Sequence, residues 1–329
     1  MDSQIMGLKV FVLVVVMALS PLKAHAQMDH NFAAWFDQFA GEALAAGISQ
    51  TTLQKVAAQL TLDDSVIELD QKQPEGKISF ETYVKNTLNA NRIQKGRRLM
   101  EQYRGVLSQI SLRYGVAPAI IVALWGIESS YGSNMGDYEV VNSLATLAYE
   151  GRRAAFFRKE LLEALHIIEE ENIEPYSLRG SWAGAMGQCQ FMPSTYRKFA
   201  ADYAGDGRRD IWSDEYDVLA SIAKYLAAEG WKPGYTWGRE VDVPRTISSP
   251  MIGLDYRQSL SEWARMGLKT LSGQPLPKQA INASLIQPDG PHGRSFLVYD
   301  NFRALMRWNK STYFATSVGL LANQMDPLK

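Results

Sequence analysis

The segment from Ala119 to Ile127 constrains the fold more than any other stretch, because nearly all of its residues are apolar. A surface helix keeps a polar face, so a run without one is typical of a helix that is buried on all sides. Pro118 suits the first turn of such a helix, and Gly132 is a plausible end for it. A chain of 329 residues, 46% of them hydrophobic, can bury the large core that this helix requires.

Glu128 directly follows the apolar run and is the carboxylate at its end. On a helix its neighbours are Leu124, Trp125 and Tyr131, so the carboxylate is expected to lie against large apolar groups. Loss of water there raises the pKa of a carboxyl, as a general acid working near neutral pH requires. The alternative is that Glu128 emerges at the helix end and is solvated or paired with an arginine. Its position alone does not decide between the two.

The N-terminus has the order of a secretory signal peptide. Lys9 precedes the apolar run Val10 to Leu19, and Ala24 to Ala26 supply an A-x-A site, which predicts a signal peptide over residues 1–26. The apolar run is too short to span a bilayer, so no integral membrane segment is expected after cleavage. An uncleaved anchor is the alternative, because Lys23 makes the cleavage region irregular. No cysteine is present there, which excludes a lipid-anchored N-terminus.

Charge and cysteine content exclude several classes of function. The formal net charge is −1 and no basic block occurs, so neither nucleic acid nor an anionic membrane is an expected partner. Cys189 is the only cysteine, so the exported chain has no internal disulfide. A nucleophilic role for Cys189 is disfavoured, because the three histidines of the mature chain show no recognisable pairing with it. The same scarcity of ligands argues against zinc.

Hydrophobic periodicity predicts a mainly helical architecture with a small β-containing insertion. After Trp231, prolines and glycines cluster, and short β-type runs appear at Glu240 to Val243 and Ser295 to Tyr299. Helices are predicted elsewhere: short ones between Asn31 and Leu60 with Ser49 or Thr51 as a cap, then Glu81 to Tyr114, Arg152 to Glu171, Ser194 to Tyr203, Asp217 to Gly230, Ser259 to Met266, and two between Asn301 and Met325 that meet near Trp308.

Two stretches together resemble the paired signature of the B-type lytic murein transglycosylases. They are ALWGIESSYG at 123–132 and GSWAGAMGQCQFMPSTY at 180–196. Three further blocks match in order: VIELDQKQPE at 66–75, DGRRDIW with ASIAKYLAAEGW between 206 and 231, and RWNKSTYFATSVGLLA at 307–322. The resemblance spans nearly the whole mature chain, and five ordered blocks make it specific.

The resemblance implies a lysozyme-like catalytic core with additional helical segments and a small β-containing subdomain. The chain is then expected to divide into a signal peptide at 1–26, an N-terminal helical segment at 27–115, the catalytic core at 116–231, the β-containing subdomain at 232–300, and helices at 301–329 that complete the core. It also implies a periplasmic enzyme, expected to be a monomer, that acts on peptidoglycan glycan strands and cleaves the MurNAc–GlcNAc β-1,4 bond. No cofactor is implied as necessary.

Site residues carry over from the resemblance position by position. Glu128 matches the single catalytic acid of the family, Ser181 and Gln190 match residues that hydrogen-bond the sugars, and Tyr225 and Asn309 match further positions that line the cleft. The aromatic rings of Tyr131 and Trp308 are also candidates for contact with sugar rings, although aromatic residues dominate protein cores too. Three positions differ from the pattern, with Trp308, Phe156 and Phe314 where relatives often have tyrosine.

The segment Gly180 to Pro193 suits a wall of a binding cleft. Its small residues let the backbone approach a bulky polymer, and Ser181, Gln188 and Gln190 supply donors and acceptors for sugar groups. Without the family resemblance, a glycine-rich packing turn would be the preferred interpretation.

The number of carboxylates bears on the mechanism, because most glycosidases need two. Only Glu128 has a strong claim here. If the 6-hydroxyl of MurNAc is the nucleophile, a single acid suffices: Glu128 protonates the glycosidic oxygen and then takes the proton of that hydroxyl as a 1,6-anhydro ring closes. Two rivals remain: a hydrolytic lysozyme-type muramidase with a second acid such as Asp137, Glu139 or Glu150, and a non-catalytic peptidoglycan-binding protein.

The segment Asp202 to Asp210 resembles a degenerate calcium loop. Asp202, Asp206 and Asp210 stand at the first, fifth and ninth positions of an EF-hand loop, a glycine at the sixth, and the carbonyl of Arg208 at the seventh. Ala204 and Ser213 replace ligands at the third and twelfth positions, which weakens affinity, although Asp217 can serve as a late ligand. The alternative is an Asx-rich turn in which Asp206 and Asp210 pair with Arg208 or Arg209.

Overall fold

The computed structural model describes residues 20–72, 78–150 and 152–326. The chain divides into two compact units, residues 1–47 and 48–329. In the first unit, helix α1 (Ser20–Ala45) is continuous where short helices were predicted. The rings of Phe32, Trp35 and Phe39 stack in succession along it, as their helical spacing predicts. The predicted signal peptide, residues 1–26, lies largely outside the described residues.

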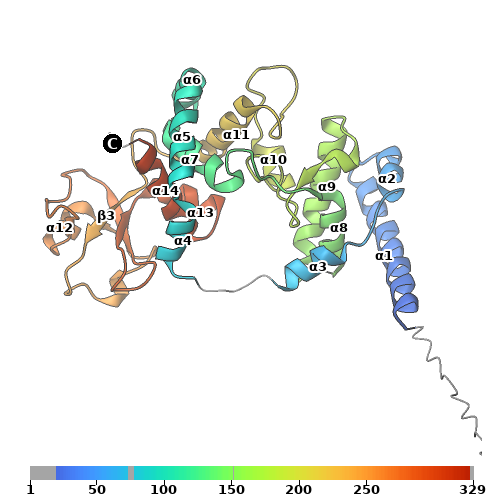
Figure 1. Ribbon diagram of the computed structural model, residues 1–329, viewed down its shortest axis with the longest axis horizontal. Helices are drawn as coiled ribbons and strands as arrows, with labels where there is room; N and C mark the ends of the chain where they lie inside the picture. The colour runs from blue at the N-terminus through green and yellow to red at the C-terminus, as the bar shows by residue number, and fades with distance from the viewer. Residues whose placement is uncertain (1–19, 73–77, 151, 327–329) are drawn as a thin grey trace, which may run out of the picture. The chain divides into compact units, whose positions relative to one another are not determined.

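The unit from Ile48 to Lys329 begins with short helices whose starts are set by side-chain caps (Figure 1). Ser49, Asp63, Ser79 and Asn89 each accept a hydrogen bond from a backbone N–H in the first turn of the helix that follows. The prediction that Ser49 or Thr51 caps a helix is therefore confirmed for Ser49. These helices are α2 (Gln50–Ala57), α3 (Asp64–Gln71), α4 (Phe80–Thr87), α5 (Ala90–Gln102) and α6 (Arg104–Tyr114).

Helix α7 (Pro118–Ser129) is the buried helix that the apolar run predicts. Residues from Ala119 to Gly126 are all buried, and α7 contacts α5, α6, α11 and α14. Within the described residues no single helix is long and apolar enough to cross a membrane, while α6 and α7 pass that test only as a pair bent by 108°.

The remaining helices of this unit, outside its β-containing part, come from distant parts of the chain. They are α8 (Val140–Glu150), α9 (Ala154–Glu170), α10 (Pro193–Phe199), α11 (Glu215–Ala228), α13 (Asp300–Trp308) and α14 (Thr312–Met325), with two 3₁₀ turns at Pro175–Ser177 and Ser249–Met251. Of these helices, α11 and α14 pack against α7. The two predicted C-terminal helices are confirmed, and Ser311 caps α14. The buried Phe314, Val318 and Leu321 lie on α14, which packs against α7.

A five-stranded antiparallel sheet forms the small β-containing part. Its strand order is β4-β6-β7-β3-β5, from β3 (Gly238–Asp242), β4 (Gln258–Ser259), β5 (Lys269–Thr270), β6 (Asn282–Ile286) and β7 (Phe296–Val298). Helix α12 (Leu260–Arg265) lies beside β3 (Figure 1) and buries Trp263 in a cluster with Val241 and Leu297. The predicted strands near Glu240 and Ser295 are confirmed, and so is the mainly helical fold with a small β-containing subdomain.

A further prediction about the helices is wrong, and helix α8 was missed. The single helix predicted from Glu81 to Tyr114 is three helices, because Asn89 caps a new start and the chain leaves helical geometry again at Tyr103, whose ring packs edge-on against Trp125. Helix α8 was not predicted. Its residues from Val140 to Ala148 are all buried, and such a short apolar run has no periodicity that distinguishes a helix from a strand.

Candidate active site

Glu128 lies in the last turn of α7, where the chain reverses sharply. Three successive residues after the helix have left-handed backbone geometry, with φ of 53° at Ser130, 60° at Tyr131 and 76° at Gly132. Such geometry is unfavourable for residues other than glycine and persists only where surrounding contacts hold it. A Cβ atom at Gly132 would come within 2.4 Å of Gln188 Oε1, so this turn also requires glycine for space.

Helix α5 supplies the contacts that hold the turn. Arg92 Nη2 donates to Ser130 Oγ at 3.2 Å, and Lys95 Nζ donates to the Ser130 carbonyl at 3.2 Å. Tyr131 donates its hydroxyl to the Arg92 carbonyl at 2.8 Å, and its buried ring packs edge-on against Trp125. The predicted contact of Tyr131 with substrate therefore needs correction: this side chain lies inside the protein and supports the turn that follows Glu128.

Gln188 links α7 to the loop that carries the second signature. Trp125 Nε1 donates to Gln188 Oε1 at 2.7 Å, and Gln188 Nε2 donates to the Trp212 carbonyl at 3.0 Å. The amide is buried and both of its ends are bonded within the protein. The expectation that Gln188 offers hydrogen bonds to sugars is therefore wrong, and its role is to fix the loop against α7.

The glycine-rich loop itself is folded tightly around two short bridges. Gly180 pairs with Met186, and Met186 pairs with Phe191. Gln190 has a φ of 51° and donates its amide to the Met135 and Gly187 carbonyls at 3.0 and 2.9 Å, which leaves Oε1 as the free end of the side chain. Ser181 Oγ accepts from the Ala185 N–H at 3.1 Å and keeps its hydroxyl proton to donate.

Trp308, at the end of α13, makes the direct contact with Glu128. Its indole Nε1 donates to Glu128 Oε1 at 2.6 Å, and its ring packs on Tyr225 and Phe191 with centroids 4.7 and 5.3 Å apart. Tyr225 is buried and donates its hydroxyl to the Arg307 carbonyl at 2.8 Å, so it supports Trp308 from within. Asn309 is exposed and accepts from the Ser311 N–H at 3.1 Å.

Burial raises the pKa of Glu128 to about 7, and the hydrogen bond from Trp308 partly opposes that rise. The expectation that apolar surroundings keep this acid protonated near neutral pH is met. The residues that surround it differ in part from those predicted. Leu124 and Trp125 were expected from helical spacing, whereas Trp308 lies 180 positions along the chain.

The charge of the Glu128 carboxylate affects the pKa of two further side chains, Tyr83 and Cys189. Burial raises the pKa of Tyr83, on α4, and the Glu128 carboxylate raises it further. Burial and the same carboxylate hold the pKa of Cys189 well above its usual range, so its thiol stays protonated. Tyr83 was not predicted. It lies in a polar helix outside the recognised blocks, and no local signal connects it with Glu128.

The three candidates for a second acid are either bonded to other side chains or exposed to solvent. Glu139 accepts from Arg179 at 3.1 Å and from Asn142 at 2.9 Å, while Asp137 and Glu150 are exposed. None of the three contributes to the pKa of Glu128. Within the described residues, Glu128 therefore stands as a carboxylate without an acidic neighbour that affects its ionisation.

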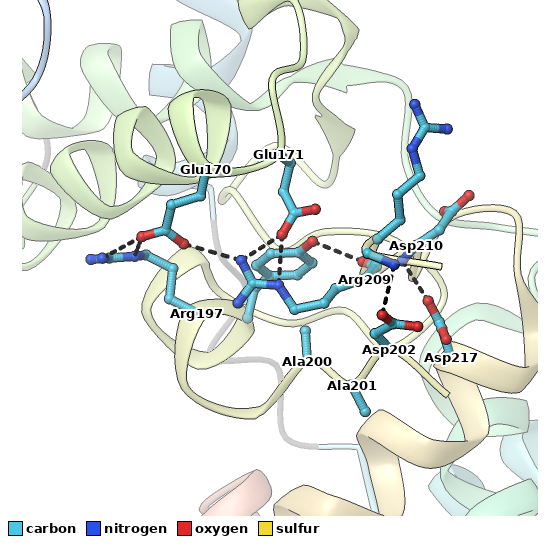
Figure 2. A network of polar contacts seen from close by, with 12 residues as sticks. Glu170, Glu171, Arg197, Ala200, Ala201, Asp202, Arg209, Asp210 and Asp217 are labelled. Atoms are coloured by element: carbon cyan, nitrogen blue, oxygen red, sulfur yellow. Dashed lines mark hydrogen bonds and ion pairs between the residues drawn. The ribbon is translucent and has the colours of Figure 1, made fainter. Parts of the chain in front are cut away.

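The aspartates of the calcium-like loop are occupied by the loop's own backbone (Figure 2). Asp202 accepts from the N–H groups of Gly205, Asp206 and Gly207. Asp206 accepts from the Arg208 N–H, and Asp210 from the N–H groups of Trp212 and Ser213. Asp217 is buried and accepts from Tyr203 and Asp210 N–H at 2.7 Å each.

In this structure these residues form a turn and not a calcium site, so calcium binding stays a prediction. No group of three or more His, Cys, Asp or Glu side chains in the described residues is arranged to hold a metal ion. The alternative, an Asx-rich turn, describes the loop. Of the two predicted arginines, Arg208 acts on Asp210: burial alone would raise the pKa of Asp210, but hydrogen bonds from Ser213 and Trp212 and the charge of Arg208 lower it below its usual value. Arg209 does not pair with these aspartates. Its guanidinium instead bonds Glu171 at 2.6 Å and Glu170 at 3.1 Å, as Figure 2 shows.

Comparison with known proteins gives a consistent result. Residues 31–323 match the model of the transglycosylase SLT domain family. The chain belongs to this family. It is 34% identical over 285 residues to membrane-bound lytic murein transglycosylase B of Escherichia coli K12, covering 83% of this chain and 77% of the relative. Membership gives the enzyme class, lytic murein transglycosylase.

Solved structures agree with the fold. SltB3 of Pseudomonas aeruginosa, solved in complex with NAG-anhNAM-pentapeptide, has a TM-score of 0.86 at 42% identity, covering 89% of this chain and 79% of that one. The lytic transglycosylase Slt35 of E. coli, solved in complex with calcium, has a TM-score of 0.75 at 32% identity, covering 89% of this chain and 92% of that one. The expected lysozyme-like core with additional helices and a small β-containing subdomain is thereby confirmed.

Proposed function

We propose that this family member cleaves the β-1,4 bond between MurNAc and GlcNAc in peptidoglycan without water, leaving 1,6-anhydroMurNAc ends. The observation that carries the proposal is Glu128: a half-buried carboxyl whose pKa burial raises to about 7, with no second carboxylate affecting it. Solved complexes of the related SltB3 contain NAG-NAM-pentapeptide and NAG-anhNAM-pentapeptide, a pair that differs by the anhydro ring.

In the first step the protonated Glu128 acts as general acid. Its proton passes to the glycosidic oxygen, the bond between that oxygen and C1 of MurNAc breaks, and the GlcNAc-containing strand leaves with a new hydroxyl. The acetamido oxygen of MurNAc stabilises the positive charge that develops at C1. A carboxyl with a pKa near 7 suits this step, because enough of it is protonated at neutral pH.

In the second step the Glu128 carboxylate acts as general base. It takes the proton of the MurNAc 6-hydroxyl while that oxygen bonds to C1, which closes the 1,6-anhydro ring and returns Glu128 to its acid form. One residue thus serves both steps, and no second protein carboxylate is needed.

Substrate contacts are assigned to side chains that keep a free polar group or an aromatic face. Ser181 has a hydroxyl proton to donate, Gln190 keeps Oε1 as an acceptor, and Asn309 keeps its amide, while Trp308 offers part of its ring. Tyr225 and Tyr131 are assigned supporting roles, because both are buried with their hydroxyls bonded to backbone carbonyls.

We place the enzyme in the periplasm as a monomer, with residues 1–26 removed as a signal peptide and with glycan strands as its partner. The A-x-A site at Ala24 to Ala26 supports this placement. N-terminal sequencing of the exported protein tests the cleavage, since a mature chain that begins at Gln27 is expected.

Mass spectrometry of peptidoglycan sacculi digested with the purified enzyme tests the reaction. Muropeptides with 1,6-anhydroMurNAc ends are the expected products. Reducing ends alone would make the protein a hydrolytic muramidase, and a sample without products would make it a binding protein.

The variant Glu128→Gln tests the role of the acid. The amide keeps the shape of the side chain but can neither give nor recover a proton, so turnover should fall by roughly two to four orders of magnitude while sacculus binding is retained. Glu139→Gln is the matched control and should keep most activity. Substantial turnover by Glu128→Gln would assign the acid to another residue.

A further inference from the structure

The hydrogen bond from Trp308 reaches only one of the two carboxyl oxygens of Glu128, Oε1. An indole N–H is a donor only, and it points at Oε1 from 2.6 Å. Among the described residues no hydrogen bond reaches Oε2, and this oxygen is also absent from the buried polar atoms that lack a partner. Oε2 is therefore the oxygen that remains open to a ligand.

We infer that Trp308 is a positioning residue that confines the exchangeable proton of Glu128 to Oε2. A protonated Oε1 is a much poorer acceptor for the indole N–H than a carbonyl Oε1, so the acid form is more stable with the proton on the other oxygen. This inference deepens the proposed function, because Oε2 would then face the glycosidic oxygen with its proton already in place.

The fold holds the indole rigidly enough for this role. Its ring packs against both Tyr225 and Phe191, and the Tyr225 hydroxyl donates to the carbonyl of Arg307, the residue before Trp308. A tyrosine at position 308 would present a hydroxyl that both donates and accepts. That hydroxyl would tolerate the proton on either oxygen, whereas the indole favours only one arrangement.

The other titratable groups near Glu128 have pKa values well above neutral, so Glu128 is the group that changes its charge near pH 7. Tyr83 from α4 and Cys189 from the glycine-rich loop both have raised pKa values and stay neutral there. Burial likewise raises the pKa values of Tyr131 and Tyr225 to about 12. Arg92 on α5 bonds the Thr87 carbonyl and Ser130 Oγ.

The indole resonance of Trp308 tests the contact without any need for turnover. In protein labelled with ¹⁵N-tryptophan, one of the eight indole N–H signals should move with pH with a midpoint of about 7. The same signal should lose its pH dependence in Glu128→Gln, where Oε1 still accepts. Trp125 and Trp263 are internal controls, because their N–H groups bond to the neutral Gln188 and to the Ala283 carbonyl.

A static Trp308 signal, or one that still moves in Glu128→Gln, would overturn the inference. Because this measurement needs no substrate, it separates failure of the inference from failure of the proposed reaction.

The pH profile of activity supplies the second test. Trp308→Phe removes the N–H that favours the carboxylate, so the high-pH limb of kcat should shift upward by about one pH unit. Turnover should fall about tenfold or more, because the carboxyl loses the hydrogen bond that orients it as well as its preferred protonation site. Trp308→Tyr should restore part of the turnover, because a tyrosine hydroxyl can again orient the carboxyl. If Trp308 only packs, activity falls equally at every pH and the limb stays in place, which would contradict the inference; the melting curve of each variant reports its folding independently.

Discussion

At the residue scale, an ionisable side chain held half-buried carries a cost in folding free energy that depends on pH. The pKa of Glu128 is about 7 in the folded protein and near 4.5 in an unfolded chain, so the folded state binds the extra proton between these values. The cost is absent below about pH 4.5, grows through that interval and is constant above about pH 7. We expect Glu128→Gln to stabilise the fold by roughly 2 kcal/mol at about pH 8, less than the full pKa difference implies because the side chain is partly exposed.

Urea unfolding of both proteins at about pH 8 and about pH 5 measures this difference. The stabilisation should shrink markedly at the lower pH, and an equal effect at both values would contradict the assigned pKa.

Of the residues around Glu128, only those on its own helix could be predicted from the sequence. Helical spacing placed Leu124 and Trp125 beside it and indicated a raised pKa. Trp308, Tyr83 and Cys189 reach Glu128 through tertiary packing, about which local periodicity says nothing. The same limit explains Tyr131 and Gln188. Their residue types suit sugar binding, but the backbone and indole groups that bind them come from α5 and α7.

At the scale of elements, the loop from Asp202 to Asp210 is held in place by hydrogen bonds from its own backbone to carboxylates. Asp217 is buried, and its two oxygens hold the Tyr203 and Asp210 N–H groups at the two ends of the loop. We therefore expect the melting temperature to be unchanged by a chelator or by added calcium. A rise on adding calcium would show that the loop rearranges to bind it.

The variant Asp217→Asn tests whether the two hydrogen bonds accepted by Asp217 stabilise the loop. The amide can accept one of the two N–H groups but must turn its own donor toward the other, which should cost about 2 kcal/mol of stability. Asp206→Asn is the matched control, because Asp206 is exposed and the amide oxygen can still accept from the Arg208 N–H. Equal losses for the two variants would remove Asp217 from its assigned role.

Elements with strong local signals were the ones predicted correctly. Helix α7 has an unbroken apolar run and a proline at its start, and α14 has Ser311 as a cap and a periodic apolar face. Helix α8 and strand β6 were missed because both are short, apolar and buried, a pattern that fits either structure. The break of the predicted helix at Tyr103 depends on the contact of its ring with Trp125, which only the folded core supplies.

At the scale of the whole molecule, the active site depends on the packing of the entire unit from Ile48 to Lys329. Tyr83 comes from α4, Glu128 from α7, Gln190 from the glycine-rich loop and Trp308 from α13. These parts meet only when the core around α7 is complete. Activity and global folding of this unit should therefore be lost together, without a partly folded active form.

Cys189 is a natural reporter of that cooperativity. It is the only cysteine in the chain, its side chain is fully buried, and burial keeps its pKa raised, so it reacts only when the glycine-rich loop opens. Labelling with a thiol reagent in the native state should be at least about a thousandfold slower than in unfolded protein. In a urea series, the labelled fraction should follow the loss of tryptophan fluorescence, which reports the buried Trp125 and Trp237. Labelling that finishes at clearly lower urea would show instead that the loop beside Glu128 opens on its own, and the site would then be a separately mobile part of a stable core.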